Sequence, residues 1–176
     1  MKAYKIVFTS KTGNTEKIAK AIYEILPDRS KDIERLTEDT KTNDADMYLI
    51  GFWVDRGSCS IDIMDFLDEL DGKKIFLFGT CGMKPDGEYY KRIENNVKAF
   101  IPDGNDYLGF YLCQGKMPMS IRSRYEDMKE KPEYQDEAER MLRNFDDGLL
   151  HPDAKDLEEA KRSVKRIIEK EEYQYE

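Results

Sequence analysis

The chain has 176 residues, a formal net charge of −8 at pH 7 and 38% charged residues. We expect one domain over residues 1–176, and the acidic balance argues against nucleic acid, whose phosphates would repel such a surface. The sequence has neither a run of roughly 20 apolar residues nor the apolar region of a signal peptide, so we expect a cytoplasmic protein without a membrane partner.

The first predicted elements are a buried strand over residues 4–8 and an amphipathic helix after it. The strand is a short apolar run, and the helix carries apolar side chains at i, i+4, i+7 and i+8, starting from Ile18. Between them lies a loop with four hydroxyl side chains and one glycine, Thr9-Ser10-Lys11-Thr12-Gly13-Asn14-Thr15. Because the first amides of a helix lack internal partners and carry the positive end of its dipole, this loop suits an anion.

Two interpretations of the loop stay open from these residues alone. It has neither the glycine and lysine spacing of the ATP- and GTP-binding loop nor the three glycines of the dinucleotide-binding turn. What remains is a hydroxyl-lined cup for one terminal phosphate monoester. The alternative is an ordinary helix start, since Ser, Thr and Asn are the usual capping residues.

Four more strands and three more helices are expected in the regular part of the chain. The predicted strands are residues 32–36, 47–52, 74–79 and 107–113, and the predicted helices are residues 61–70, residues 88–101 with Phe100 on the buried stripe, and a last helix after Asp153. Several strands are near-continuous apolar runs, which is typical of parallel strands covered on both faces. The alternation predicts an α/β fold in which helices cover both faces of a parallel sheet.

A long charged segment over residues 114–150 interrupts this alternation. We predict a helical insertion in which Pro132 divides two helices. One interpretation is a hairpin packed on the sheet edge, and the other is an element that docks a partner beside a ligand. His151 follows this segment and is the only histidine, so a Ser-His-Asp triad or a multi-histidine metal site is not expected. We expect it to face solvent or to cap the last helix.

Ligands of such a sheet bind at the carboxyl ends of the strands, where the strand order reverses. Two further loops at that edge carry unusual residues. The first, Trp53-Val54-Asp55-Arg56-Gly57, holds the only tryptophan, which suits stacking on a planar ring but also packs ordinary cores. The second follows residues 74–79 and reads Thr80-Cys81-Gly82-Met83. We expect Cys81 to be a buried, inert thiol, and the three widely spaced cysteines argue against a disulfide framework.

The stretch T-S-K-T-G-N-T resembles the phosphate loop of the flavodoxins, T-x-[ST]-x-G-N-T, which holds flavin mononucleotide (FMN). The resemblance implies a flavodoxin-like three-layer sandwich with a five-stranded parallel sheet in the order 2-1-3-4-5. It also implies that FMN is the cofactor. Its phosphate would contact the side chains of Ser10, Thr12, Asn14 and Thr15 and the backbone of Lys11 and Gly13. We expect the Lys11 side chain to point to solvent.

The resemblance assigns the other two loops to the flavin ring. Residues 53–57 would place Trp53 against the ring and supply a peptide, within residues 55–57, that reorients on reduction. Residues 80–83 would meet the pyrimidine edge of the ring with backbone amides. Many flavodoxins stack a tyrosine from this loop, whereas the present sequence reads Cys81-Gly82-Met83. Either Tyr89 or Tyr90 swings in, or that face of the ring is left to Met83 or is open.

An electron carrier is the function that the resemblance implies. Such a protein shuttles electrons through a flavin semiquinone between a reductase and an acceptor enzyme, and the acidic surface favours redox partners with basic docking surfaces. An FMN-dependent NAD(P)H:quinone-type oxidoreductase is the alternative, and a cofactor-free interaction module is a third possibility. The sequence points to no catalytic residue and no metal ligand.

Overall fold

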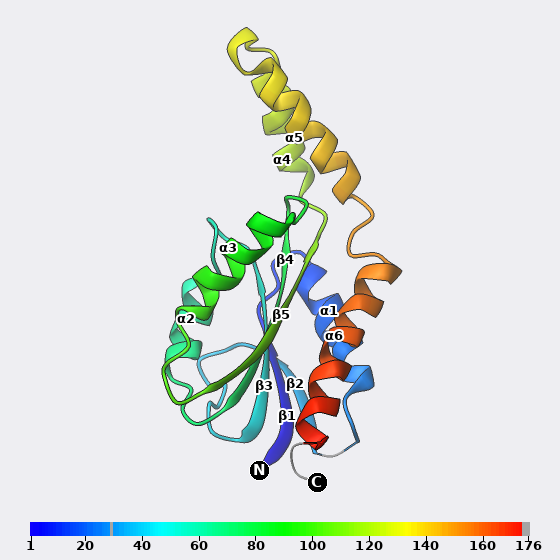
Figure 1. Cartoon of the computed structure of the whole chain (residues 1–176). Helices are drawn as coiled ribbons and strands as arrows, with labels where there is room; N and C mark the ends of the chain where they lie inside the picture. The colour runs from blue at the N-terminus through cyan, green and yellow to red at the C-terminus, as the bar shows by residue number, and fades with distance from the viewer. Residues whose placement is uncertain (29, 174–176) are drawn as a thin grey trace.

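Five parallel strands form the central sheet in the order β2-β1-β3-β4-β5 (Figure 1). The computed structural model describes residues 1–28 and 30–173 of the chain. The strands are β1 (Lys2–Phe8), β2 (Lys31–Arg35), β3 (Ala45–Trp53), β4 (Lys74–Cys81) and β5 (Asp106–Gln114). The predicted flavodoxin-like fold and its strand order are therefore confirmed.

Helices cover both faces of this sheet. α1 (Asn14–Ile25) and α6 (Ala154–Tyr173) lie on one face, and α2 (Ile61–Asp68) and α3 (Gly87–Lys98) lie on the other (Figure 1). Successive residues of β3 enter different cores, since Leu49 packs with the side chains of α1 and α6 and Ile50 packs with those of α2 and α3. Both are fully buried, which explains why the strand is apolar at neighbouring positions. Within residues 1–28 and 30–173, no helix combines the length and the apolar character that a membrane span requires.

Several element ends differ from the predicted ones. The expectation that a loop begins at Thr80 is wrong, because Thr80 and Cys81 still pair with β5 and are buried. Gln114 is the last residue of β5 and is also buried, so the segment that links the sheet to α6 begins one residue later than expected. α3 ends at Lys98, and Phe100 is 36% exposed instead of lying on a buried stripe.

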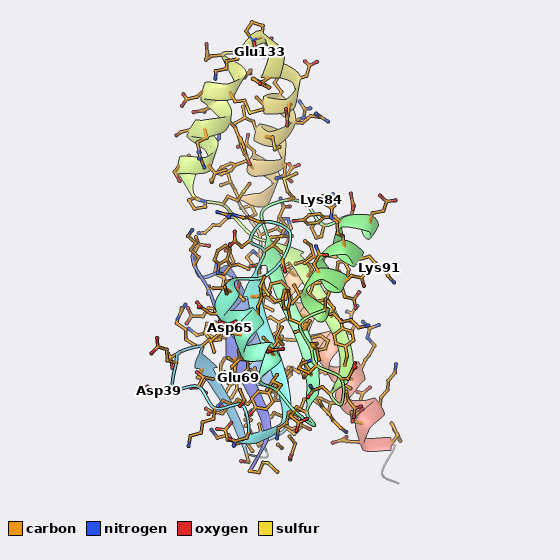
Figure 2. The ribbon with its side chains drawn as sticks, turned by 90° about the vertical axis from the view of Figure 1, so that its left-hand side faces the viewer. Asp39, Asp65, Glu69, Lys84, Lys91 and Glu133 are labelled. Carbon is orange, nitrogen blue, oxygen red and sulfur yellow. The ribbon has the colours of Figure 1, made fainter. Side chains whose placement is uncertain are left out.

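Residues 119–148 form a helical hairpin that projects beyond the carboxyl ends of the strands (Figure 1). The hairpin consists of α4 (Met119–Lys129), the 3₁₀ turn η1 (Pro132–Tyr134) and α5 (Gln135–Gly148). Its tip, near Glu133, lies at the end of the molecule farthest from the amino-terminal end of the sheet (Figure 2). The interpretation as a hairpin packed on the sheet edge is wrong, because the hairpin stands beyond the carboxyl ends of the strands and does not lie along an outer strand. Of its two helices, α4 has no buried residue and α5 buries Ala138, Phe145 and Gly148.

Candidate functional site

The three loops singled out in the sequence start from one edge of the sheet. β1 and β3 are neighbours, but the chain passes from β1 to β2 on the other side, so the strand order reverses between β1 and β3. Backbone pairing continues just past the strand ends, from Thr9 N–H to Gly51 O (3.0 Å) and from Val54 N–H to Thr80 O (2.8 Å). This is the position at which doubly wound sheets bind their ligands.

The first loop curls into a cup at the amino terminus of α1. Gly13 has φ +89°, a left-handed conformation that L side chains rarely adopt. The Ser10 hydroxyl accepts a hydrogen bond from Gly13 N–H (3.1 Å), and the first helical bond runs from Lys17 N–H to Gly13 O (3.1 Å). The amides of Asn14 and Thr15 therefore stand outside the helical ladder and suit an anion.

Two of the predicted phosphate ligands also hold the site together. Thr15 is buried, and its hydroxyl lies 2.9 Å from the Thr80 hydroxyl and donates to Phe52 O at 3.3 Å, so it links the first loop to β3 and β4. The Asn14 amide donates to Thr12 Oγ1 (3.1 Å) and to Lys116 O (2.9 Å). In this structure the side chains of Asn14 and Thr15 fix the loop, whereas Ser10 and Thr12 lie at its more open part.

Lys11 is exposed, as expected, and its side chain also contacts Trp53. Its ammonium group lies over the Trp53 ring, 5.3 Å from the ring centroid, an arrangement that the electron-rich face of an indole favours. Trp53 is the last residue of β3 and is partly exposed. This contact brings the first loop directly against the tryptophan of the second loop.

Arg35 is a neighbour of the first loop that the sequence did not reveal. It is the last residue of β2, and its guanidinium donates to Ser10 O (2.7 Å) and pairs with Glu16 (3.1 Å). Lys11 and Arg35 together place two cations beside the hydroxyl cup, one of them paired with a carboxylate. The parallel register of β1 and β2, which sets Phe8 opposite Arg35, is the signal from which this contact follows.

A tight turn over residues 55–58 forms the second loop. Asp55 and Ser58 exchange two backbone hydrogen bonds, of 2.8 and 3.0 Å, around Arg56 and Gly57. Both central residues have positive φ, 48° and 81°. The Gly57 carbonyl accepts a hydrogen bond from the Asn96 amide (2.7 Å), so this peptide is held by α3.

The third loop is shorter than predicted and offers Met83 as its open side chain. Cys81 is buried and donates through its thiol to Met83 O (3.0 Å), and burial raises the pKa of Cys81 to about 12. The expectation that this thiol is buried is confirmed. Tyr90 is not free to swing toward the loop, because its hydroxyl donates to Phe110 O (2.7 Å) and its ring packs on the Phe110 ring. Met83 is 41% exposed.

Unpaired oxygens mark the first two loops. Among residues 1–28 and 30–173, the buried side-chain oxygens without a hydrogen-bond partner are Thr9 Oγ1, Asn14 Oδ1, Ser58 Oγ and Ser60 Oγ. Such a group costs about 1–3 kcal/mol, so folded proteins keep few of them. Ser58 Oγ has only the weak contact of the Cys59 thiol. The hydroxyls can donate to phosphate or ring oxygens and the amide oxygen can accept from a ligand hydroxyl, so this donor set fits FMN.

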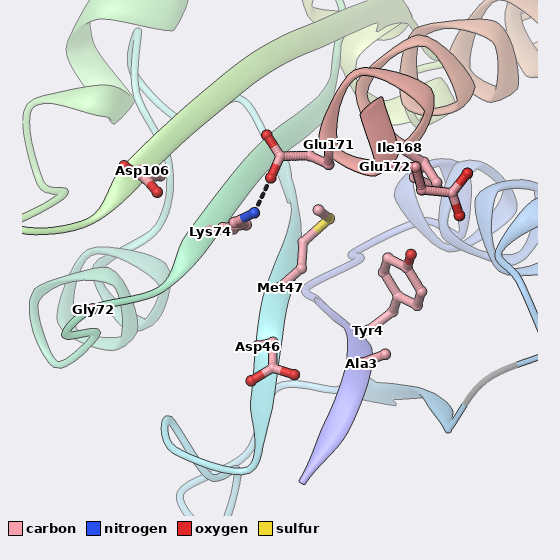
Figure 3. Close-up of a pocket in the computed structure, with 10 residues that line it drawn as sticks. All are labelled: Ala3, Tyr4, Asp46, Met47, Gly72, Lys74, Asp106, Ile168, Glu171 and Glu172. Carbon is pink, nitrogen blue, oxygen red and sulfur yellow. Dashed lines mark hydrogen bonds and ion pairs between the residues drawn. The ribbon is translucent and has the colours of Figure 1, made fainter. Parts of the chain in front are cut away.

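A hollow at the opposite end of the sheet is the alternative position for a ligand, but its charge is wrong for a phosphate (Figure 3). Its lining includes Tyr4, Met47 and four carboxylates, and Lys74 forms an ion pair with Glu171 across it. The acidic lining would repel an anionic ligand. The carboxyl edge of the sheet is therefore the better candidate for the functional site.

His151, Asp153 and Asp156 form a capping arrangement at the start of α6. Asp153 Oδ1 accepts from Asp156 N–H (2.9 Å), Asp156 Oδ2 accepts from Asp153 N–H (2.8 Å), and His151 Nδ1 lies 2.6 Å from the same oxygen. The backbone N–H of Asp156 lowers the pKa of Asp153. Asp153 therefore caps α6, whereas His151 contacts the Asp156 carboxylate instead of a helix amide. This arrangement accounts for a cluster whose ligand atoms all lie within 4.8 Å of one another.

Sequence comparison matches one family along most of the chain. The profile of the flavodoxin domain covers residues 5–165. A curated relative, the flavodoxin-like domain-containing protein BilS of Clostridioides difficile (strain CD3), is 31% identical over 166 residues, which is 93% of this chain and 94% of that protein. The matched region includes the three loops and the hairpin.

Solved structures show the same fold. A flavodoxin from the domain Archaea superposes with a TM-score of 0.55 at 19% identity, covering 96% of this chain and 97% of its own. A flavoprotein in complex with FMN from Lactobacillus acidophilus NCFM superposes with a TM-score of 0.50 at 17% identity, covering 72% of this chain and 99% of its own. These structural similarities support the fold assignment, whereas the assignment of the site rests on the geometry of the three loops.

Proposed function

Because the chain belongs to the flavodoxin family, we propose that it binds FMN and carries electrons between a reductase and an acceptor enzyme. One observation supports this most directly. The Lys11 ammonium lies 5.3 Å from the centroid of the Trp53 ring, so a hydroxyl-lined anion cup and an aromatic platform stand side by side at the switch point of the sheet. A phosphate joined to a planar ring needs both.

The phosphate end of FMN is held by the first loop. The amides of Asn14 and Thr15, which lie outside the helical ladder, and the hydroxyls of Ser10 and Thr12 would donate to the phosphate oxygens. Lys11 and Arg35, which lie beside the loop, would lower the energy of the bound anion. The bound ring supplies the redox chemistry, since it accepts and returns one or two electrons. The protein orients the ring, through Trp53 and the loop that bears Met83, and limits the access of water to it.

A charged redox partner is preferred over a small anionic acceptor. The chain carries a formal net charge of −8, which attracts basic docking surfaces and repels anions. Such attraction raises association rates, and added salt weakens it as the Debye length shortens from about 30 Å at 0.01 M to about 8 Å at 0.15 M. The partners are proposed to be a reductase and an acceptor enzyme with basic faces.

Binding of FMN against riboflavin tests the cofactor assignment. Trp53 is the only tryptophan in the chain, so its fluorescence reports the site without interference from another indole. We expect FMN to quench this emission strongly and riboflavin to bind at least about tenfold more weakly, because the phosphate contacts are worth more than about 1.4 kcal/mol. Equal affinity for the two flavins would refute the phosphate cup, and unquenched emission at saturating FMN would refute the ring contact.

The exposed Met83 favours a second candidate function. The third loop itself has no tyrosine, and Tyr90 is bound to β5. An open ring face would admit a nicotinamide or a quinone. The chain would then be an NAD(P)H:quinone-type oxidoreductase. Anaerobic mixing of the FMN-loaded protein with NADPH separates the two. Rapid bleaching by NADPH alone supports the oxidoreductase, and a requirement for a separate reductase supports the carrier.

A further inference from the structure

The hairpin touches the third loop through one side chain. Asn144 lies in α5, and its Nδ2 donates to Gly82 O (3.0 Å) while its Oδ1 accepts from Lys84 N–H (3.0 Å). The carboxamide thus pairs with the backbone on both sides of Met83, as a neighbouring strand would. Figure 2 labels Lys84 at the junction where the hairpin meets the sheet.

Gln114 anchors the same contact from below. It is the buried last residue of β5, and its Nε2 lies 3.0 Å from Gly82 O and 3.2 Å from both Asn144 O and Asn144 Oδ1. The Met117 side chain packs directly on Gly82, since a Cβ there would lie 2.4 Å from Met117 Sδ. The loop is therefore held from three directions, by β5, by the segment that leads into α4, and by α5.

The same connecting segment reaches the first loop. Lys116 O accepts from the Asn14 amide (2.9 Å), and a Cβ on Gly115 would lie 2.6 Å from that amide. Residues 115–117 thus contact the first and the third loop before the chain enters the hairpin. The base of the hairpin therefore meets the end of β5 and both loops through Asn144 and residues 115–117.

We propose that Asn144 is a positioning residue that fixes residues 82–84 for FMN and so couples the hairpin to the cofactor. The proposal rests on FMN binding as proposed above. Loss of the carboxamide frees Lys84 N–H and half of the bonding at Gly82 O, and the loop then samples other conformations. Since FMN selects the ordered loop, its apparent dissociation constant rises as the ordered fraction falls. By reciprocity, bound FMN must stabilise the base of α5.

Three variants and one ligand test this coupling. Asn144→Ala removes the hydrogen bonds to Gly82 O and Lys84 N–H together with the weaker contacts of this side chain to Gln114 and Met83. Asn144→Asp keeps the acceptor for Lys84 N–H and loses the donor to Gly82 O, and Arg143→Ala changes the exposed neighbour on the same helix. Each is titrated with FMN, and backbone amide exchange is measured with and without saturating FMN. Circular dichroism and exchange in α4 establish that the hairpin is folded, and Asn144→Asp carries the test if Asn144→Ala is not.

The expected result is graded. FMN slows exchange over residues 141–148 in the wild type and in Arg143→Ala, less in Asn144→Asp, and not in Asn144→Ala. The FMN dissociation constant rises about tenfold in Asn144→Ala, as expected when the fraction of molecules with an ordered loop falls about tenfold. If FMN protects residues 141–148 equally in Asn144→Ala, the coupling is refuted while the cofactor assignment stands. If the wild type does not bind FMN, the proposed function and this inference both fail.

Discussion

The two ends of the sheet differ in how their buried polar groups are paired. At the amino-terminal end the Lys5 side chain is only 2% exposed and its ammonium group is fully paired, whereas at the carboxyl end four buried side-chain oxygens of the described residues have no hydrogen-bond partner. The Lys5 ammonium bonds to Asp44 (2.9 and 3.1 Å), Glu34 (2.6 Å) and Lys41 O (3.3 Å), and the Tyr48 hydroxyl donates to the same aspartate. Burial lowers the pKa of Lys5, but the two carboxylates outweigh it and the pKa is raised. One end is built for stability and the other for a ligand.

The largest effect is expected where the paired end is broken. Lys5→Met removes the cation that Asp44 and Glu34 share, and we expect the free energy of unfolding to fall by about 3 kcal/mol. FMN affinity should not change, because the site is at the other end. Urea unfolding measures the loss, and Lys155→Met, at an 82% exposed side chain, is the control. A loss equal to that of the control would contradict the comparison.

Removal of the two accessible hydroxyls of the first loop should weaken phosphate binding at the carboxyl end. In the double variant Ser10→Ala, Thr12→Ala, two donors to the phosphate are lost at about 1 kcal/mol each, so FMN affinity should fall about 30-fold. Riboflavin is the internal control, because it lacks the phosphate and should bind the variant and the wild type alike. Fluorescence titration measures both ligands, and a parallel loss for riboflavin would show a damaged ring site instead.

A matched pair of threonines sharpens the comparison. Thr9 Oγ1 is buried without a partner, and Thr15 Oγ1 is bonded to Thr80 and Phe52. Thr9→Val should therefore raise the free energy of unfolding of the FMN-free protein by about 1 kcal/mol, while Thr15→Val should lower it by about as much. Thermal or urea unfolding gives the sign. Destabilisation of equal size in both variants would show that the Thr9 oxygen is paired in solution.

The smallest expected effect is on the loss of stability at acidic pH. The hydrogen bond from Lys2 lowers the pKa of Asp32 from 3.8. Burial raises the pKa of Asp44, but the hydrogen bonds from Lys5 and Tyr48 and the charges of Lys5 and Lys2 together outweigh it, so this pKa is lowered as well. A carboxyl with a lowered pKa stabilises the folded state above its unfolded value, and this stabilisation is lost as the pH falls below about 4. Asp32→Asn should flatten this loss. Because Asp32 is 38% exposed, we expect less than about 1 kcal/mol, measured by urea unfolding between pH 6 and 3.

Much of the fold could be predicted because it depends on local pattern. The runs over residues 47–52 and 74–79 are apolar on both faces of each strand, which is enough to assign parallel strands that helices cover on both sides. The first loop was found for the same reason, as its hydroxyls and glycine follow one another in sequence. The end of β4 was missed because Thr80 and Cys81 are not strongly apolar, and only their pairing with β5 keeps them in the strand.

The contacts that complete the site could not be predicted, because they join residues that lie far apart in the sequence. Asn144 and Gly82 are 62 residues apart, and Asn144 belongs to a charged segment with no pattern that points toward the sheet. Lys11 is exposed as expected, but nothing in its own loop predicts its contact with an aromatic ring. The Trp53 ring that attracts it comes from β3 and becomes a neighbour only through the β1–β3 pairing.

The projecting hairpin also changes how the molecule tumbles and scatters. A compact chain of 176 residues has a radius of gyration of about 16 Å. Mass carried beyond the carboxyl end of the sheet raises that value and lengthens one axis of inertia (Figure 1). Small-angle scattering should therefore give a pair-distance distribution with an extended tail. Backbone N–H vectors parallel to the hairpin axis should relax at a different rate from those perpendicular to it. Rotational diffusion alone therefore reports whether the hairpin keeps its orientation relative to the sheet.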